Sequence, residues 1–181
     1  MSDWSSFRRR MVLYLVAAVL LSGAWVMNRP SVATAAGKVC PVAVRPSYTD
    51  DWGACRGKGC RRRHKGNDLF VPEGTPIRAV ADGVVRTDDV DRYNPRSGTD
   101  LGGITITLHT WDGYVVYYAH NQRNVVRGRS VPVRQGQVIA RSGKSGNARW
   151  ALPHLHIQVK RSGEPWHNPY RFVRRWCGPS R

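Results

Sequence analysis

Short segments that alternate between apolar and polar residues fill most of the chain between Phe70 and Lys160. In GITITLHT, for example, Ile104, Ile106 and Leu108 would share one face of a strand, because successive strand side chains point to opposite faces. Glycine- and aspartate-containing turns separate this segment from its neighbours. The pattern predicts an all-β fold of short antiparallel strands with little helix.

Further strands are expected on both sides of that segment. The chain is expected to form a hairpin that turns at Asp82-Gly83. A second turn, at Trp111-Asp112-Gly113, is expected to lead into a returning strand. A pair of short strands is expected around Gln135-Gly136, followed by a last strand. A long polar loop and a short helical tail complete the prediction. In chain order these segments are TPIRAVADGVVRT, DDVDRYNPRSGTDLGG, YVVYYAH, VPVRQGQVIARSG, HLHIQVK and PYRFVRRW.

The N-terminus has the order of residues found in export signals. The basic stretch Phe7–Arg10 precedes the apolar run Met11–Met27, and Ala33-Thr34-Ala35 then offers a small-x-small cleavage site. The apolar run is also nearly long enough to span a membrane, so an uncleaved anchor is the alternative. In either case we expect a secreted, periplasmic or cell-wall-associated protein, anchored through residues 11–27 if the segment stays uncleaved.

Basic residues outnumber acidic ones by 29 to 12, which gives a formal net charge of +17. A chain with this charge accumulates on polyanions such as nucleic acid, acidic lipid or an anionic cell wall. Charge alone does not choose among them. The sequence contains no nucleic-acid recognition motif, so no specific nucleic-acid partner is expected.

Four cysteines, Cys40, Cys55, Cys60 and Cys177, lie in the part of the chain that is expected to be exported, where disulfides form and persist. Three pairings are possible. Cys55 and Cys60 bracket the stretch RGKG, which can turn back on itself, so we predict the bridges Cys55–Cys60 and Cys40–Cys177. A zinc cluster is the alternative, but no C-x-x-C pair supports it.

The last strand carries two histidines on one face. In ALPHLHIQVK, His154, His156 and Gln158 alternate with aliphatic residues that would face the core. One imidazole could bind a metal ion while the other reaches a water molecule on it. Two polar strand residues that merely face solvent would give the same pattern. A further histidine, His120, is expected to share a strand face with Tyr118.

The stretch RRRHKGNDLF offers a second group of candidate ligands. Gly66 and Asn67 disfavour a helix, and an extended segment places His64 and Asp68 on one side. Two histidines and a carboxylate are a reasonable zinc set, with the fourth position left open for water. The alternative is that Asp68 only neutralises the neighbouring cations Arg61–Arg63.

Together these motifs resemble one family. H-x-x-x-D followed by G-T-P, Y-x-A-H, S-G-x-S-G-N and H-L-H, in this order, is similar to the pattern of the lysostaphin-like (LytM-type) zinc metallopeptidases, bacterial enzymes that cut peptide cross-links in peptidoglycan. The match extends from about Trp52 to Tyr170. The resemblance implies a twisted antiparallel sheet whose strands and long loops form a groove with zinc at its floor.

The resemblance also implies roles for individual residues. His64, Asp68 and His156 would be the ligands of Zn²⁺. His120 and His154 would be the catalytic pair beside it.

The chain departs from the family pattern at three places. The stretch ARWALP inserts a few residues before the H-L-H motif, a cysteine-bracketed basic loop replaces the glycine-rich approach to His64, and Asn168 stands where aspartate is more common. The only glutamates, Glu73 and Glu164, lie in Pro/Gly turns away from any H-E-x-x-H motif. A zinc hydrolase built from this sequence therefore needs a histidine as its base.

We therefore predict a secreted zinc endopeptidase that acts on stem or cross-link peptides of peptidoglycan and is held on an anionic wall polymer by its charge. The alternative is a non-catalytic wall-binding relative that activates another hydrolase. A monomer is expected, with membrane contact only through an uncleaved N-terminus. The predicted parts are a signal peptide or N-terminal membrane anchor (1–35), an extended lead-in (36–51), the zinc metallopeptidase domain (52–177) and a tail (178–181).

Overall fold

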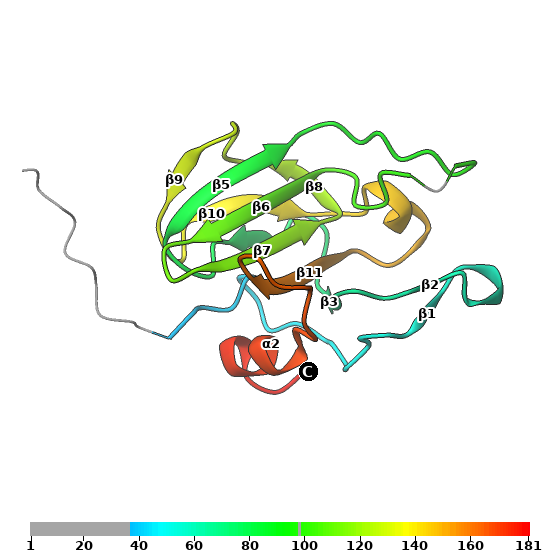
Figure 1. The fold of residues 1–181 in the computed structure, drawn as a ribbon, viewed down its shortest axis with the longest axis horizontal. Coiled ribbons are helices and arrows are strands. Elements are labelled where there is room, and N and C mark those ends of the chain that lie inside the picture. Colours follow the sequence, from blue (N-terminus) through cyan, green and yellow to red (C-terminus); the bar gives the residue numbers. More distant parts are fainter. Residues whose placement is uncertain (1–36, 98) are drawn as a thin grey trace, which may run out of the picture. The chain divides into compact units, whose positions relative to one another are not determined.

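The computed structural model describes residues 37–97 and 99–181. As predicted, most of their regular secondary structure is strand, with one short α-helix (Figure 1). The strands are β1 (Cys55–Arg56), β2 (Arg62–Arg63), β3 (Asn67–Phe70), β4 (Pro76–Arg78), β5 (Gly83–Asp88), β6 (Thr105–Thr110), β7 (Tyr114–Ala119), β8 (Asn121–Asn124), β9 (Val131–Val133), β10 (Val138–Ser142) and β11 (His154–Arg161). The helical elements are the 3-10 turns η1 (Lys58–Cys60) and η2 (Gly146–Trp150) and the helix α2 (Tyr170–Cys177).

The strands form three antiparallel sheets. The largest has six strands in the order β3-β11-β7-β6-β5-β9, and a second has three in the order β4-β10-β8. The two-stranded hairpin β1-β2 projects from the body of the domain, at the same end as η2 and the long loop before β6 (Figure 1). Because β11 lies between β3 and β7, His156 is flanked by residues from both of these strands.

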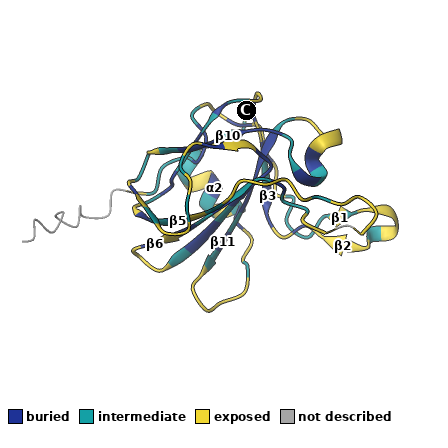
Figure 2. Cartoon of the chain, turned by 90° about the horizontal axis from the view of Figure 1, so that it is seen from above, coloured by how far each residue is buried: buried dark blue, intermediate teal, exposed yellow. Residues whose placement is uncertain are grey.

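The core lies between the two larger sheets. Leu108, Tyr118 and Ile157 of the six-stranded sheet are fully buried in one apolar cluster with Ile77 and Ile139 of the three-stranded sheet. Figure 2 shows buried stretches along the strands and exposed residues in the loops and at the hairpin tip. Burial of side chains of this size contributes about 1.5–3 kcal/mol each, so the two sheets hold each other in place.

The alternation expected for GITITLHT is confirmed in β6. Ile106 and Leu108 are buried in the core, whereas His109 is exposed. The turn at Trp111–Gly113 returns the chain as β7, which pairs with β6. The last strand (β11), the polar loop between β5 and β6, and the helical tail (α2) are also present where they were expected.

The prediction of a hairpin around Asp82-Gly83 is wrong. β4 pairs with β10 in the three-stranded sheet, whereas β5 pairs with β6 and β9 in the six-stranded one. Ala79 and Val80 between them are fully buried, so this segment carries the chain through the core from one sheet to the other. Gly83 is required by close packing, because a Cβ there would lie 2.2 Å from the carbonyl oxygen of His109. β9 and β10 are likewise in different sheets.

Residues 37–51 pack along the domain in an extended form. Val42 is buried in the core, and Val42 and Ser47 form isolated β-bridges with Ile77 and Phe70. Within the described residues there is no helix with the length and apolar character needed to cross a membrane. The segment predicted as a signal peptide or anchor, residues 1–35, lies outside the described residues.

Both predicted disulfides are confirmed. Cys40–Cys177 joins the segment before β1 to the end of α2 over a sequence separation of 137. Cys55–Cys60 closes the tip of the β1-β2 hairpin over a separation of 5. The alternative of a zinc cluster made by the cysteines is therefore wrong.

The two bridges should contribute differently to stability. Replacing Cys40 and Cys177 by serine should lower the free energy of unfolding by about 3–5 kcal/mol, because a long closed loop restricts the unfolded chain most. Replacing Cys55 and Cys60 should lower it by about 2 kcal/mol or less, since that loop is short. Urea unfolding under non-reducing conditions measures both losses, and equal losses would contradict this argument.

Candidate metal centre

The register of β11 brings two of the predicted ligands together. His156 pairs with Asp68 on β3 and with Ala119 on β7. Paired residues of antiparallel strands project their side chains to the same face, so the carboxylate of Asp68 lies beside the imidazole of His156. Nδ1 of His156 is 2.9 Å from Oδ1 of Asp68.

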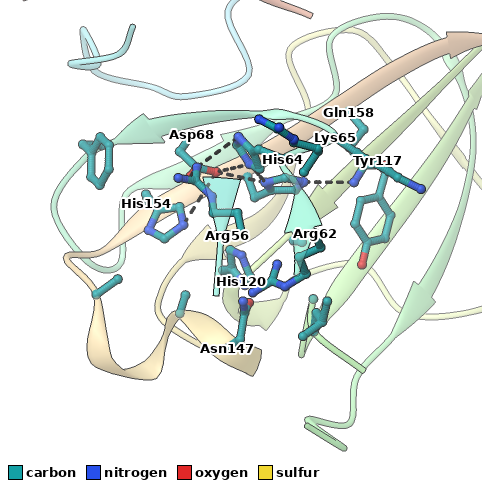
Figure 3. A pocket seen from close by; sticks show the side chains of 18 residues that line it. Arg56, Arg62, His64, Lys65, Asp68, Tyr117, His120, Asn147, His154 and Gln158 are labelled. Atoms are coloured by element: carbon teal, nitrogen blue, oxygen red, sulfur yellow. Dashed lines mark hydrogen bonds and ion pairs between the residues drawn. The ribbon is translucent and has the colours of Figure 1, made fainter. Parts of the chain in front are cut away.

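His64 joins this pair from the segment between β2 and β3. Gly66 makes the close approach possible, because a Cβ at that position would lie 2.4 Å from Cε1 of His156. Nε2 of His64 lies 2.9 Å from Nδ1 of His156 and 3.2 Å from Oδ1 of Asp68. All three residues line one groove, in which Figure 3 labels His64 and Asp68.

This triangle of donor atoms fits a small divalent metal ion. Such an ion takes nitrogen and oxygen ligands at about 2.0–2.2 Å in tetrahedral geometry, which separates neighbouring ligand atoms by about 3.3 Å. The separations of 2.9, 2.9 and 3.2 Å are close to that spacing. His64, Asp68 and His156 are therefore a group that could hold a metal ion.

Polar contacts behind the ligands hold them in position. Nη2 of Arg56 donates to Oδ2 of Asp68 and to Oδ2 of Asp51, both at 2.8 Å. Asp51 also lies 2.9 Å from Nδ1 of His64, which leaves Nε2 of that ring directed at the other two donor atoms. Gln158 contacts Nε2 of His156 at 3.0 Å. Contacts of this kind fix the orientation of ligating histidines.

The alternative role for Asp68, neutralising Arg61–Arg63, is wrong, because its arginine partner is Arg56. The sequence alone did not point to Arg56 or Asp51. The signal that was available for Arg56 is its place inside the loop closed by Cys55–Cys60, since such a loop fixes the residues within it.

His120 and His154 lie beside the three candidate ligands. Nδ1 of His154 donates to the carbonyl of Leu152 at 2.7 Å, and Nδ1 of His120 donates to the carbonyl of Ser145 at 2.9 Å. Because a carbonyl oxygen only accepts hydrogen bonds, each neutral ring carries its proton on Nδ1 and presents an unprotonated Nε2. The two ring centroids are 4.9 Å apart, and Nε2 of His154 lies 3.8 Å from Oδ1 of Asp68.

The prediction that Tyr118 and His120 share a strand face is wrong. Tyr118 is fully buried, and its hydroxyl accepts a hydrogen bond from the backbone N–H of Val80 at 3.2 Å. β7 ends at Ala119, and His120 has a φ of 64°, a left-handed conformation that breaks the strand period. The turn directs the His120 ring to the ligand side, and Tyr117 is the tyrosine that lines the groove.

Burial and neighbouring charges set the protonation of the site. Burial lowers the pKa of His64, but hydrogen bonds to Asp51 and Asp68 outweigh it and raise the pKa to about 9. Burial raises the pKa of Asp68, but hydrogen bonds from His156 and His64 outweigh it and bring the pKa well below its usual range. Burial, followed by the neighbouring histidines, lowers the pKa of His120 to about 3. At neutral pH the metal-free site therefore holds a protonated His64, an ionised Asp68 and a neutral His120.

The five predicted site residues line one groove with a volume of about 570 Å³. Its floor comes from β3, β7 and β11. One wall is the β1-β2 hairpin with the segment that follows it, and the other is the loop at Leu101-Gly102 together with η2. An antiparallel sheet that carries a metal-binding group and two further histidines in a groove is the arrangement expected of a metallopeptidase.

Comparison with known families agrees with that class. The model of Peptidase family M23 matches residues 62–168, a segment that contains all five site residues, and the chain belongs to this family. The resemblance to lysostaphin-like peptidases that the sequence motifs indicated is therefore confirmed.

Individual relatives resemble this chain over its folded part. An L-Ala–D-Glu endopeptidase of Bacillus subtilis is 32% identical over 147 residues, which are 75% of this chain and 42% of that protein. The peptidoglycan DD-endopeptidase ShyC of Vibrio cholerae is 34% identical over 102 residues, 56% of this chain and 21% of that protein. The chain thus spans less than half the length of both endopeptidases. The catalytic domain of lysostaphin from Staphylococcus simulans has a TM-score of 0.59 and 25% identity, covering 71% of this chain and 92% of that one.

Metal binding should release a proton from His64. Its pKa of about 9 means that the ring is protonated at pH 7, and a metal ion must displace that proton. Metal affinity should therefore rise with pH up to about 9 and level off above it. Calorimetric titration of the metal-free protein with Zn²⁺ in buffers of different ionisation enthalpy measures the protons released.

Asp51→Asn is the matched variant for this titration, because it removes a hydrogen bond that raises the pKa of His64. It should release fewer protons at pH 7 than the wild-type protein. Metal affinity that is independent of pH between 6 and 9 would contradict the prediction.

Proposed function

We propose that this chain is a secreted zinc-dependent endopeptidase that hydrolyses stem peptides or peptide cross-links of bacterial peptidoglycan. The observation that carries the proposal is the convergence of His64, Asp68, His156, His120 and His154 on one groove. Membership of Peptidase family M23 supports it, as do relatives that are named endopeptidases.

Zinc is the proposed cofactor. Two imidazoles and a carboxylate are a typical ligand set for catalytic zinc, whereas calcium and magnesium prefer oxygen ligands. A bound zinc ion supplies Lewis acidity, which polarises a carbonyl group and lowers the pKa of water. His64, Asp68 and His156 would hold the ion, and Arg56 and Asp51 would keep the ligands oriented.

His120 and His154 are the proposed catalytic pair. Each ring presents an unprotonated Nε2 because its Nδ1 proton is donated to a backbone carbonyl. Nε2 can accept a proton from an attacking water, and the protonated ring can then hydrogen-bond the developing oxyanion or protonate the leaving amine. Burial keeps the pKa of His120 low, so this ring is neutral and ready to accept a proton at neutral pH.

The positions of the two glutamates support a histidine as the base. Glu73 contacts Gln122, and Glu164 pairs with His167. Neither glutamate is among the residues that line the groove. The proton acceptor for an attacking water would therefore be supplied by the histidines.

The proposed location is outside the cytosol. The N-terminal sequence has the order of an export signal, and residues 11–27 would anchor the chain if they are not removed. Two disulfides in one small domain are consistent with an oxidising compartment.

Incubation of the purified protein with isolated cell walls of several peptide chemistries tests the proposal. The zinc-loaded protein should release soluble muropeptides and expose new amino groups. A chelator should stop the release, and added zinc should restore it. Walls that are bound but never cut, together with faster cutting by a second hydrolase, would favour the non-catalytic activator instead.

Substitutions should separate metal ligands from proton-transfer groups. His156→Ala should lose zinc and activity together, because it removes one of three protein ligands. His154→Ala should keep near-stoichiometric zinc but lose about 10²–10⁴-fold in rate, the usual contribution of a positioned acid–base group. His120→Ala should behave in the same way. The double variant should lose much less than the product of the single losses, because both rings act on one water.

Metal content and turnover are measured on the same preparations of these variants. His167→Ala is the matched control, since His167 is exposed and does not line the groove. A zinc-free His154→Ala beside an active, zinc-loaded His156→Ala would reverse the proposed roles. Full activity in both variants would mean that neither histidine belongs to the catalytic centre, and it would overturn the proposed site.

The net charge of +17 should attach the protein to anionic wall polymer. Sedimentation with cell walls should show binding that weakens steeply as salt is added, because exposed charges are screened. Cleavage of a small soluble peptide without net charge should change little over the same range. Equal salt sensitivity in the two assays would mean that the charge does not serve wall attachment.

A further inference from the structure

The charges that line the groove are unevenly distributed. Arg56, Arg62, Arg63 and Lys65, from the hairpin and the segment after it, face a single carboxylate, that of Asp68. The opposite wall is uncharged and is lined by Leu101, Gly102, Asn147, Ala148 and Ala151. A substrate in the groove therefore has a cationic wall on one side and a neutral wall on the other.

Most of these cations are not neutralised within the described part of the chain. Arg56 is neutralised, because it donates at 2.8 Å to both Asp51 and Asp68. The remaining three are exposed and take part in none of the ion pairs among residues 37–97 and 99–181. These three are Arg62, Arg63 and Lys65.

Arg62 reaches the opposite wall. In the amide orientation that satisfies both polar atoms of Asn147, its oxygen accepts from Nη2 of Arg62 at 3.0 Å and its nitrogen donates to the carbonyl of Leu101 at 2.8 Å. Figure 3 shows Arg62 and Asn147 on the same side of the ligand group. The contact with Asn147 is neutral and uses one of the five N–H donors of the guanidinium, so the others remain free for a ligand.

A wall of this kind favours anionic ligands. A guanidinium binds a carboxylate through two parallel charge-assisted hydrogen bonds, and an ammonium group adds a further positive charge. A neutral peptide in the same place would take water away from the cations without offering a charge in return. The groove therefore distinguishes peptides by whether they carry a free carboxylate.

We propose that Arg62 and Lys65, assisted by Arg63, make the groove selective for acidic peptides, those with a free carboxylate beside the scissile bond. Amidated peptides and bridges made only of glycine are the disfavoured substrates. The inference rests on the proposed endopeptidase function and narrows its substrate class.

A matched pair of substrates tests this selectivity: soluble cross-linked muropeptides with free carboxylates, and the same muropeptides after chemical amidation. With the zinc-loaded full chain, kcat/KM for the carboxylate form should exceed that for the amidated form by about tenfold or more, the usual contribution of a hydrogen bond to a charged group. In the double variant Arg62→Gln/Lys65→Gln the ratio should fall toward one, mainly through a higher KM for the carboxylate form. Glutamine removes the charge at each position while keeping a polar side chain.

Arg61→Gln is the matched control. Arg61 is exposed, belongs to the same basic stretch and does not line the groove, so this variant should keep the wild-type ratio. Equal cleavage of both forms by the wild-type protein would overturn the proposal. An unchanged ratio in the double variant would also overturn it.

Binding of the same muropeptides, measured by calorimetry, separates this inference from the proposed function. Tighter binding of the carboxylate form, lost in the double variant but not in Arg61→Gln, would support the assignment whether or not a peptide is cut. Equal binding of both forms would overturn it. Absence of turnover on every wall and muropeptide, with zinc bound, would overturn the endopeptidase function instead.

Discussion

The site depends on one set of backbone hydrogen bonds, those that pair β11 with β3 on one side and with β7 on the other. This register places His156 opposite both Asp68 and Ala119. A slip of one residue would turn both histidines of β11 into the core. Leu155 and Ile157 oppose such a slip, because both are fully buried and would then lie in the groove. The hydrophobic core thus fixes the position of the candidate ligands.

The short β1-β2 hairpin links the candidate metal centre to the wall of the groove. Its disulfide, Cys55–Cys60, encloses Arg56, which joins Asp51 to Asp68 behind the ligands. The same hairpin continues into the exposed basic residues that line the groove. The disulfide-closed hairpin therefore positions Arg56, which holds a candidate ligand in place. It also leads into the basic residues that a substrate would meet.

The segment around η2 orients the two proposed catalytic histidines. The carbonyl of Ser145, just before η2, accepts from His120, and the carbonyl of Leu152, just after it, accepts from His154. The stretch ARWALP, which departs from the family pattern, contains Leu152 and so still provides this acceptor. Backbone carbonyls, which cannot donate, thereby fix which nitrogen of each ring is free.

The sequence by itself determined the features that arise from local periodicity and motif. Alternation predicted the strands and placed His154 and His156 on one face, and spacing indicated His64 and Asp68 as their partners. Tertiary structure alone decided which sheet each strand joins. The buried segment between β4 and β5 crosses the core, so these two strands belong to different sheets. Tertiary structure also decided the side on which His120 lies, since the left-handed turn after β7 reverses the strand period. The contacts of Arg56 and the charge of one groove wall depend on segments brought together by folding, which no local pattern records.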